Sequence, residues 1–241
     1  MASSITVADE IEALKTTAKA AQTEAVMAIA FHETWKPTAY DKELHRRMGF
    51  SYATQAFQIV RLALRREMLL ALIRIWDKNK QGQSLQITAV REKLRDKAVF
   101  NAIVDHWAGS ASDLWTKDGM RKDLEPKRAR IIELIQKYLE GGSGFSVVEG
   151  LRTLRHERLA HYQLEETKAE AATADTTDDE IEAFYEDTLE IVRLLLSLVW
   201  GDTFSLSGDV AGVYRHYAKF FWENVSGEQA EGPPANYRRM S

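Results

Sequence analysis

Apolar residues recur every three or four positions along most of the chain, and this spacing predicts α-helices rather than strands. The first such pattern predicts a helix over residues 7–35, ended by Pro37, because a proline ring disfavours a helical conformation in the residue before it. The next pattern predicts one helix over residues 41–78 that runs through the core. Its apolar stripe consists of Phe50, Ala53, Phe57, Val60, Leu64, Met68, Ala71 and Ile75.

Two shorter patterns predict helices over residues 87–94 and 98–107, after a break at 79–83. An irregular loop is expected from Gly109 to Gly119, which is rich in glycine and serine. Pro126 fits the first turn of the following helix, which should stop at Gly141-Gly142.

Two capping signatures set the starts of later helices. Ser146 and Glu149 form an S-x-x-E pattern that predicts a helix over residues 147–169. Thr177 and Glu180 repeat the pattern and predict a helix that ends at Gly201. A last helix is expected over residues 209–225.

These patterns together predict an all-α protein, a helical bundle without strands. Residues 1–226 are expected to form a single helical domain, and residues 227–241, with Pro233-Pro234, a flexible C-terminal tail.

Composition narrows the function classes. The chain contains no cysteine, which excludes disulfides and thiolate metal sites and favours a reducing compartment. Neither a signal peptide nor a membrane-spanning run is visible, so a cytoplasmic protein is expected. The net charge is −4, so nucleic acid could bind only at a local basic patch.

The helix opened by Ser146 carries titratable residues beside its apolar face. On a helical wheel, the apolar stripe is Val147, Val148, Leu151 and Leu154. The residues on or beside that stripe are Arg155, Arg158, His161 and Tyr162, whereas His156 points away from it. Burying cationic side chains costs several kcal/mol unless each is paired, so their placement requires an explanation.

Two explanations are open. In a purely structural role, the cations could pair with carboxylates of neighbouring helices, such as Asp77 or Asp187, or the stripe could simply reach the surface after Leu154. Alternatively, the stripe leads into a cleft where the guanidinium groups and imidazole bind an anion.

Two familiar site types are disfavoured by spacing. His156-Glu157 and His161 nearly match the zinc signature HExxH, but the histidines are five positions apart and lie on different faces. Gly141-Gly142-Ser143-Gly144 lacks the Gly-Lys-Ser/Thr that would follow in a phosphate loop. No metal site and no cofactor are expected.

Residues 154–161, Leu-Arg-His-Glu-Arg-Leu-Ala-His, resemble the signature of the HEPN superfamily, the higher eukaryotes and prokaryotes nucleotide-binding domains. That signature is an arginine followed by a histidine after four to six residues; here five lie between Arg155 and His161. Arg74-Ile75-Trp76-Asp77 and Ser84-Leu85-Gln86-Ile87 make the chain most similar to the abortive-infection U-type branch. The resemblance covers residues 10–200 and implies a HEPN-like bundle with additional helices.

The resemblance implies a metal-independent endoribonuclease, a homodimer whose two motifs face each other, acting in phage defence or a toxin–antitoxin system with a possible antitoxin partner. Arg155 and His161 would be catalytic, and His156, Arg158 and Tyr162 would bind RNA or nucleotide. Histidine titrates near ~6.5 and can move the 2′-hydroxyl and 5′-oxygen protons, while arginine holds the phosphate. The sequence departs from the family at Tyr162, where a basic residue is common, and in the acidic stretch after Glu165.

Two other functions remain open from sequence. A HEPN-like bundle could bind nucleotide, RNA or a protein partner without catalysis. A purely structural helical protein would satisfy Arg155, Arg158 and His161 inside one subunit.

Overall fold

The computed structural model describes residues 6–49, 51, 53–77, 87–109, 114–160, 177–202 and 205–227; for Leu114 and residues 156–160 it describes the helical backbone alone. Every regular element within these ranges is a helix, which confirms the predicted all-α class. In chain order the helices are α1 (Val7–Tyr40), α2 (Lys42–Met48), α3 (Thr54–Trp76), α4 (Ile87–Arg95), α5 (Lys97–Ala108), α6 (Leu114–Lys137), α7 (Phe145–Ala160), α9 (Asp178–Trp200), η1 (Leu206–Val210) and α10 (Ala211–Glu223).

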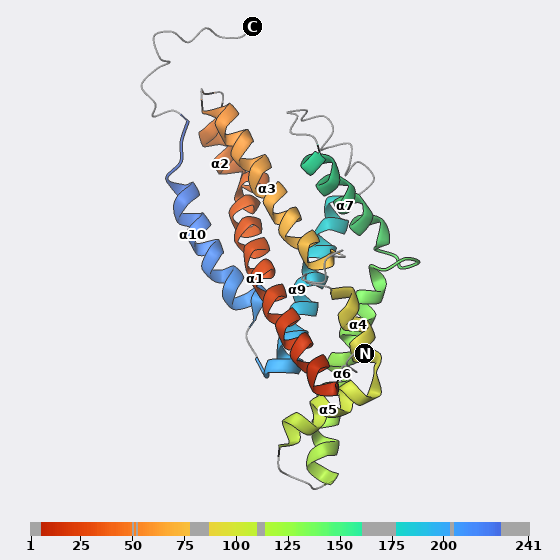
Figure 1. The fold of residues 1–241 in the computed structure, drawn as a ribbon. Helices are drawn as coiled ribbons and strands as arrows, with labels where there is room; N and C mark the ends of the chain where they lie inside the picture. The colour runs from red at the N-terminus through yellow and green to blue at the C-terminus, as the bar shows by residue number, and fades with distance from the viewer. Residues whose placement is uncertain are drawn as a thin grey trace.

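The long helix α1 organises the bundle, since it packs against α3, α9 and α10 (Figure 1). Figure 1 shows α7 and α10 on opposite sides of the fold, with α1 and α3 between them. A large apolar core joins α1, α3, α9 and the helices α4 to α7. A smaller cluster under α2 and α10 contains Leu44, Met48, Phe57, Ala218 and Trp222.

The predicted end of the first helix at Pro37 is wrong. Helix α1 continues through Pro37 to Tyr40. The proline costs one backbone hydrogen bond, but it lies in the last turn, where its carbonyl accepts from the Asp41 N–H at 2.9 Å. Asp41 also caps the start of α2 through its side chain, so the two helices are fixed to each other at this residue.

The predicted continuous helix over residues 41–78 is also wrong, because it divides into α2 and α3. Gly49 adopts a φ of 44° at the end of α2, a backbone conformation that glycine accepts without steric cost. The predicted core stripe is confirmed at Phe57, Met68 and Ile75, whereas Val60 is exposed. Phe50 lies outside the described residues.

The loop expected from Gly109 to Gly119 is shorter than predicted, and Pro126 is not in a first turn. Helix α6 begins at Leu114 and contains both Gly119 and Pro126. Ion pairs Lys127–Asp123 and Arg128–Glu125 hold the turns around the proline.

The predicted capping role of Ser146 is wrong, since α7 begins one residue earlier, at Phe145. The expected extension of this helix over residues 161–169 lies outside the described residues. The second signature is confirmed: Thr177 and Glu180 form a reciprocal capping box on α9. Gly201 ends α9 in the left-handed conformation, as predicted.

The last predicted helix is found as a π-turn, η1, that leads directly into α10. Within the described part of the chain, no helix combines the length and the apolar character needed to cross a membrane.

Candidate functional site

Helix α7 anchors the Arg/His motif through its first three turns. The apolar stripe predicted from the sequence is confirmed, because Val147, Val148, Leu151 and Leu154 are all buried. Arg155 follows directly after the last of these residues and is itself only partly buried, so the motif begins directly after this buried stripe.

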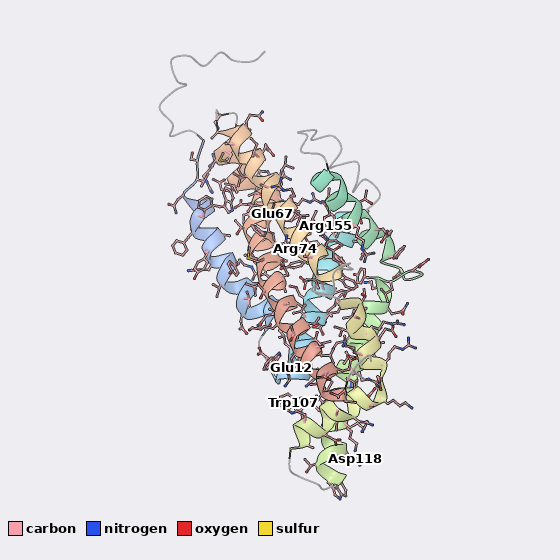
Figure 2. All side chains as sticks on the ribbon, viewed as in Figure 1. Glu12, Glu67, Arg74, Trp107, Asp118 and Arg155 are labelled. Carbon is pink, nitrogen blue, oxygen red and sulfur yellow. The ribbon has the colours of Figure 1, made fainter. Side chains whose placement is uncertain are left out.

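Arg155 binds Asp77, the residue that follows the last turn of α3, in an ion pair through Nη1. The arginine side chain is 32% exposed and the aspartate side chain 18% exposed. Figure 2 places Arg155 on the side of α7 that faces α3. The guanidinium is therefore held by a carboxylate while part of it remains open to solvent.

A second arginine of α7 fixes the same corner of the fold. Arg152 Nη2 donates to the Trp76 carbonyl at 3.0 Å, and its other terminal nitrogen pairs with Glu149. Cationic groups at the end of a helix satisfy its last carbonyl oxygens and interact favourably with its dipole. Trp76 is held in turn by its indole N–H, which donates to Thr188 Oγ1 of α9 at 3.1 Å. The position of Asp77 is thus set by α7 and α9 together.

Of the two carboxylates considered as structural partners, only Asp77 is used by a motif residue within the described part of the chain. Asp187 accepts from Lys137 Nζ at 2.7 Å and from the Tyr138 hydroxyl at 2.8 Å. Burial and this hydrogen bond raise the pKa of Tyr138, so the hydroxyl stays protonated as a donor.

The remaining predicted site residues are only partly covered. His156 and Arg158 lie in the helical backbone of α7, and nothing of their side chains is described. His161 and Tyr162 lie outside the described residues. The structure therefore describes the position of Arg155 and the helical backbone of α7 as far as Ala160.

Helix α3 presents an apolar stripe beside this region. Ile59, Leu62, Leu69 and Ile73 follow one another in steps of three, seven and four, which places them on one helix face, and Asp77 continues that face. Leu69 and Ile73 are buried, whereas Ile59 and Leu62 are exposed. The face of α3 that ends at the Arg155–Asp77 pair is therefore exposed at Ile59 and Leu62. None of the residues that the structure describes covers these two side chains.

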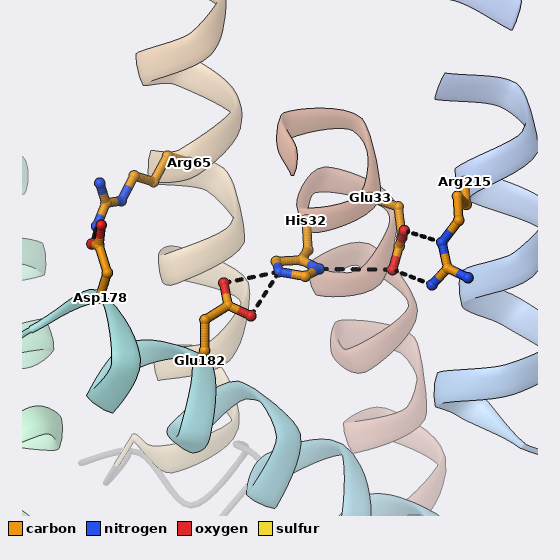
Figure 3. Close-up of polar contacts among 6 residues, drawn as sticks. All are labelled: His32, Glu33, Arg65, Asp178, Glu182 and Arg215. Atoms are coloured by element: carbon orange, nitrogen blue, oxygen red, sulfur yellow. Dashed lines mark hydrogen bonds and ion pairs between the residues drawn. The ribbon is translucent and has the colours of Figure 1, made fainter. Parts of the chain in front are cut away.

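A separate polar network, which sequence reasoning missed, lies in the centre of the bundle (Figure 3). The His32 side chain is 2% exposed, and its Nε2 lies 3.0 Å from Glu182 Oε1 of α9. Its Nδ1 lies 3.8 Å from Glu33 Oε1, and Glu33 accepts two hydrogen bonds from Arg215 of α10, at 2.9 and 3.1 Å. The ring of Tyr185 stacks on His32 with centroids 4.2 Å apart.

In this network, contacts with charged partners shift the pKa values of His32 and Glu33 more than burial does. Burial alone would lower the pKa of His32, but the contacts with Glu182 and Glu33 outweigh it, so the pKa is raised. For the Glu33 carboxyl, burial acts in the opposite direction and would raise the pKa. The contacts with His32 and the Arg215 guanidinium outweigh burial and lower the pKa to about 2. The imidazolium and both carboxylates therefore stabilise one another and join α1, α9 and α10.

The only sequence signal for this network was a charged pair, His32-Glu33, within a run of small apolar residues. Ala25, Ala28 and Ile29 of the same face are buried, so a charged pair there requires partners from other helices. The partners are about 150 and 182 positions away along the chain, which no local pattern reveals. Because His32 is enclosed, the network has the geometry of a structural element rather than of a substrate site.

Comparison with known families addresses the motif helix directly. The family model described as AbiU2, a HEPN family, matches residues 11–221, a range that contains α7 and the whole Arg155 to His161 segment. No curated protein and no solved structure matches the chain. A family match over most of the sequence, on an all-α fold, establishes membership: the chain belongs to the AbiU2 family of the HEPN superfamily.

Proposed function

We propose that the protein is a metal-independent endoribonuclease in which Arg155 and His161 cleave RNA through attack of a ribose 2′-hydroxyl. One observation carries the proposal: Arg155 follows the buried stripe of α7, is held by Asp77 and is still one-third exposed. An arginine that is positioned and reachable is suited to bind a phosphate group. The family match, which spans the motif, supports the same assignment.

The chemistry follows from the two side chains. A neutral imidazole at His161 takes the proton of the 2′-hydroxyl as that oxygen attacks phosphorus. The bond from phosphorus to the 5′-oxygen breaks, and the leaving oxygen is protonated by an imidazolium or by water. Arg155 donates to a non-bridging phosphate oxygen and stabilises the charge that develops there. The products are a 2′,3′-cyclic phosphate and a 5′-hydroxyl.

Asp77 has a positioning role in this proposal. A partly exposed ion pair contributes only about 0.2–1 kcal/mol, so an RNA phosphate can replace part of the Asp77 contact at small cost. Before RNA binds, the carboxylate keeps the guanidinium oriented at the end of α3. His156, Arg158 and Tyr162 are proposed to contact RNA around the scissile phosphate.

The active unit is proposed to be a homodimer with the two motifs facing each other. The exposed part of the α3 stripe, Ile59 and Leu62, supports a contact on this side of the fold, since it continues the face that ends at Asp77. Phage defence or a toxin–antitoxin system, with an antitoxin as partner, is the proposed setting.

The test compares His161→Ala with His106→Ala on a labelled RNA in the presence of EDTA. His106 is an exposed histidine of α5, so it controls for loss of an imidazole elsewhere. We expect the wild type and His106→Ala to cleave RNA but not DNA, and His161→Ala to be slower by roughly 10²- to 10⁴-fold. Equal rates for the two variants, or a requirement for magnesium, would show the proposal to be wrong.

A non-catalytic RNA- or nucleotide-binding module is the second candidate, because a positioned and partly exposed arginine can hold a phosphate without catalysis. Saturable RNA binding that weakens in Arg155→Ala, without cleavage by the wild type under any condition tested, would favour this function over the nuclease.

A further inference from the structure

Helix α10 has apolar side chains on both of its faces. Ala211, Ala218 and Trp222 are buried against the bundle. Val213, Tyr217, Phe220 and Phe221 point the other way and are 48–62% exposed. We call these four residues the α10 aromatic face. These exposed apolar side chains form one contiguous patch on a helix that also carries charged residues, and such a patch marks an interaction surface.

The outward direction of this face is fixed by contacts within the chain. Arg215 pairs with Glu33 of α1, and the Trp222 indole donates to the Thr34 carbonyl at 2.8 Å. Arg47 of α2 donates to the Trp222 carbonyl at 2.7 Å. Helix α10 is thus attached at its middle and at its end, and its aromatic face cannot turn inward without breaking these bonds.

The size and composition of the face fit one side of a two-fold interface. Three aromatic side chains and one valine, each about half exposed, offer roughly 400 Å² of apolar surface. A stable dimer buries about 800 Å² on each side, of which roughly 60% is apolar, so this face supplies most of the apolar part. In a two-fold dimer the same patch provides both sides. The face contains no charged residue, so two copies meet without repulsion between like charges.

From these observations we infer that the α10 aromatic face is a self-association surface, which packs against the same face of a second copy of this chain. The contact is separate from the pairing proposed at the motif, because α10 and α7 lie on opposite sides of the fold (Figure 1). A pair joined through α10 therefore carries its two motif helices on its outer sides, where both remain open to RNA or to further copies.

The first test is the solution mass of the full chain, measured by light scattering after size-exclusion chromatography. Tyr217→Arg places a charge in the centre of the face and should halve the number of copies per particle. Trp115→Arg is the matched control, since Trp115 is an 89% exposed aromatic residue of α6 that lies outside the face. Circular dichroism should be unchanged in both variants, because both side chains are exposed.

The second test uses the absence of cysteine from the sequence, which allows single cysteines to be introduced as unique reporters. With a short bismaleimide, Tyr217→Cys should form cross-linked dimers in high yield and Trp115→Cys should not. An unchanged mass in Tyr217→Arg, a monomeric wild type, or cross-linking of Ile59→Cys without that of Tyr217→Cys would overturn the inference. The last result would leave the pairing proposed at the motif intact.

Discussion

The two polar regions of this bundle are built in opposite ways. In the centre, His32 is enclosed between two carboxylates, and each charged group has a partner on a different helix. At the end of α7, Arg155 has a single carboxylate partner within the described residues and remains partly exposed. The central network determines how α1, α9 and α10 pack, whereas the motif end keeps a cation available.

The comparison teaches where to look for function in a helical bundle of this kind. A buried histidine with strongly coupled carboxylates resembles a catalytic group, but no substrate can reach His32. The partly exposed Arg155–Asp77 pair looks unimportant, yet its arginine can exchange the carboxylate for a phosphate. The two regions differ in the exposure of their titratable centre: His32 and Glu33 are enclosed, whereas Arg155 is partly open to solvent.

The largest effect is expected at the motif end. Arg155→Ala should lower kcat/KM for RNA by roughly 10²- to 10³-fold, because the charge that develops on the phosphate loses its donor. Arg193→Ala of α9 is the control, since Arg193 is similarly exposed and also paired with one carboxylate, Glu190. Steady-state cleavage of a fluorescent RNA provides the measurement. A loss of the same size in both variants would contradict the assignment.

The next effect is expected on stability, in the centre. Glu33→Gln removes the carboxylate that His32 and Arg215 share, and should lower the free energy of unfolding by about 2 kcal/mol. Glu67→Gln, in an exposed pair with Arg66 on α3, should cost less than about 0.5 kcal/mol. Urea unfolding compares the two. Equal losses would mean that the buried network does not stabilise the packing of α10.

Asp77→Asn tests the positioning role at the motif end. The variant should lower kcat by roughly tenfold, because the guanidinium is no longer oriented. Its unfolding free energy should change by less than about 1 kcal/mol, since the pair is partly exposed. A large loss of stability together with an unchanged kcat would assign the pair to structure alone.

The smallest effect is the pH dependence of stability from the central network. The folded pKa of His32 is raised above its ordinary 6.5, so its contribution is complete below about pH 6.5 and is lost as the pH rises through the folded value. Glu33, with a pKa lowered from 4.5 to about 2, contributes fully above pH 4.5 and loses that contribution as the pH falls toward 2.

These two groups together predict the greatest stability between about pH 4.5 and 6.5. Urea unfolding from pH 5 to 9 should show stability that decreases toward pH 9. The decrease should be shallower in His32→Gln, and an identical slope in that variant would show that His32 does not carry the effect.

Much of the fold could be predicted from the sequence, because apolar spacing reports directly which face of a helix is buried. Apart from the cap expected at Ser146, the predictions failed where proline or glycine was judged without its surroundings. Pro37 is tolerated because it lies in the last turn of α1, and Pro126 lies in α6 between Leu124 and Ile131, which are buried in the core. The split at Gly49 depends on a positive φ that spacing alone does not reveal.

The candidate site could be predicted only where its residues are neighbours in sequence. Arg155 and His161 are close neighbours in sequence, Arg155 lies on α7, and Asp77 was among the expected partners of the motif cations. The central network joins residues 32, 33, 182 and 215, whose contacts arise only after three helices have packed. The outward aromatic face of α10 likewise depends on how that helix is attached.

The identity of the RNA ends produced in EDTA is the most direct test of the central claim that the end of α7 is a metal-independent nuclease site. Mass spectrometry of the fragments made by the wild-type chain should find 2′,3′-cyclic phosphates and 5′-hydroxyls, and Arg155→Ala and His161→Ala should each suppress them. Fragments that carry 5′-phosphates, or cleavage that appears only after magnesium is restored, would contradict the account.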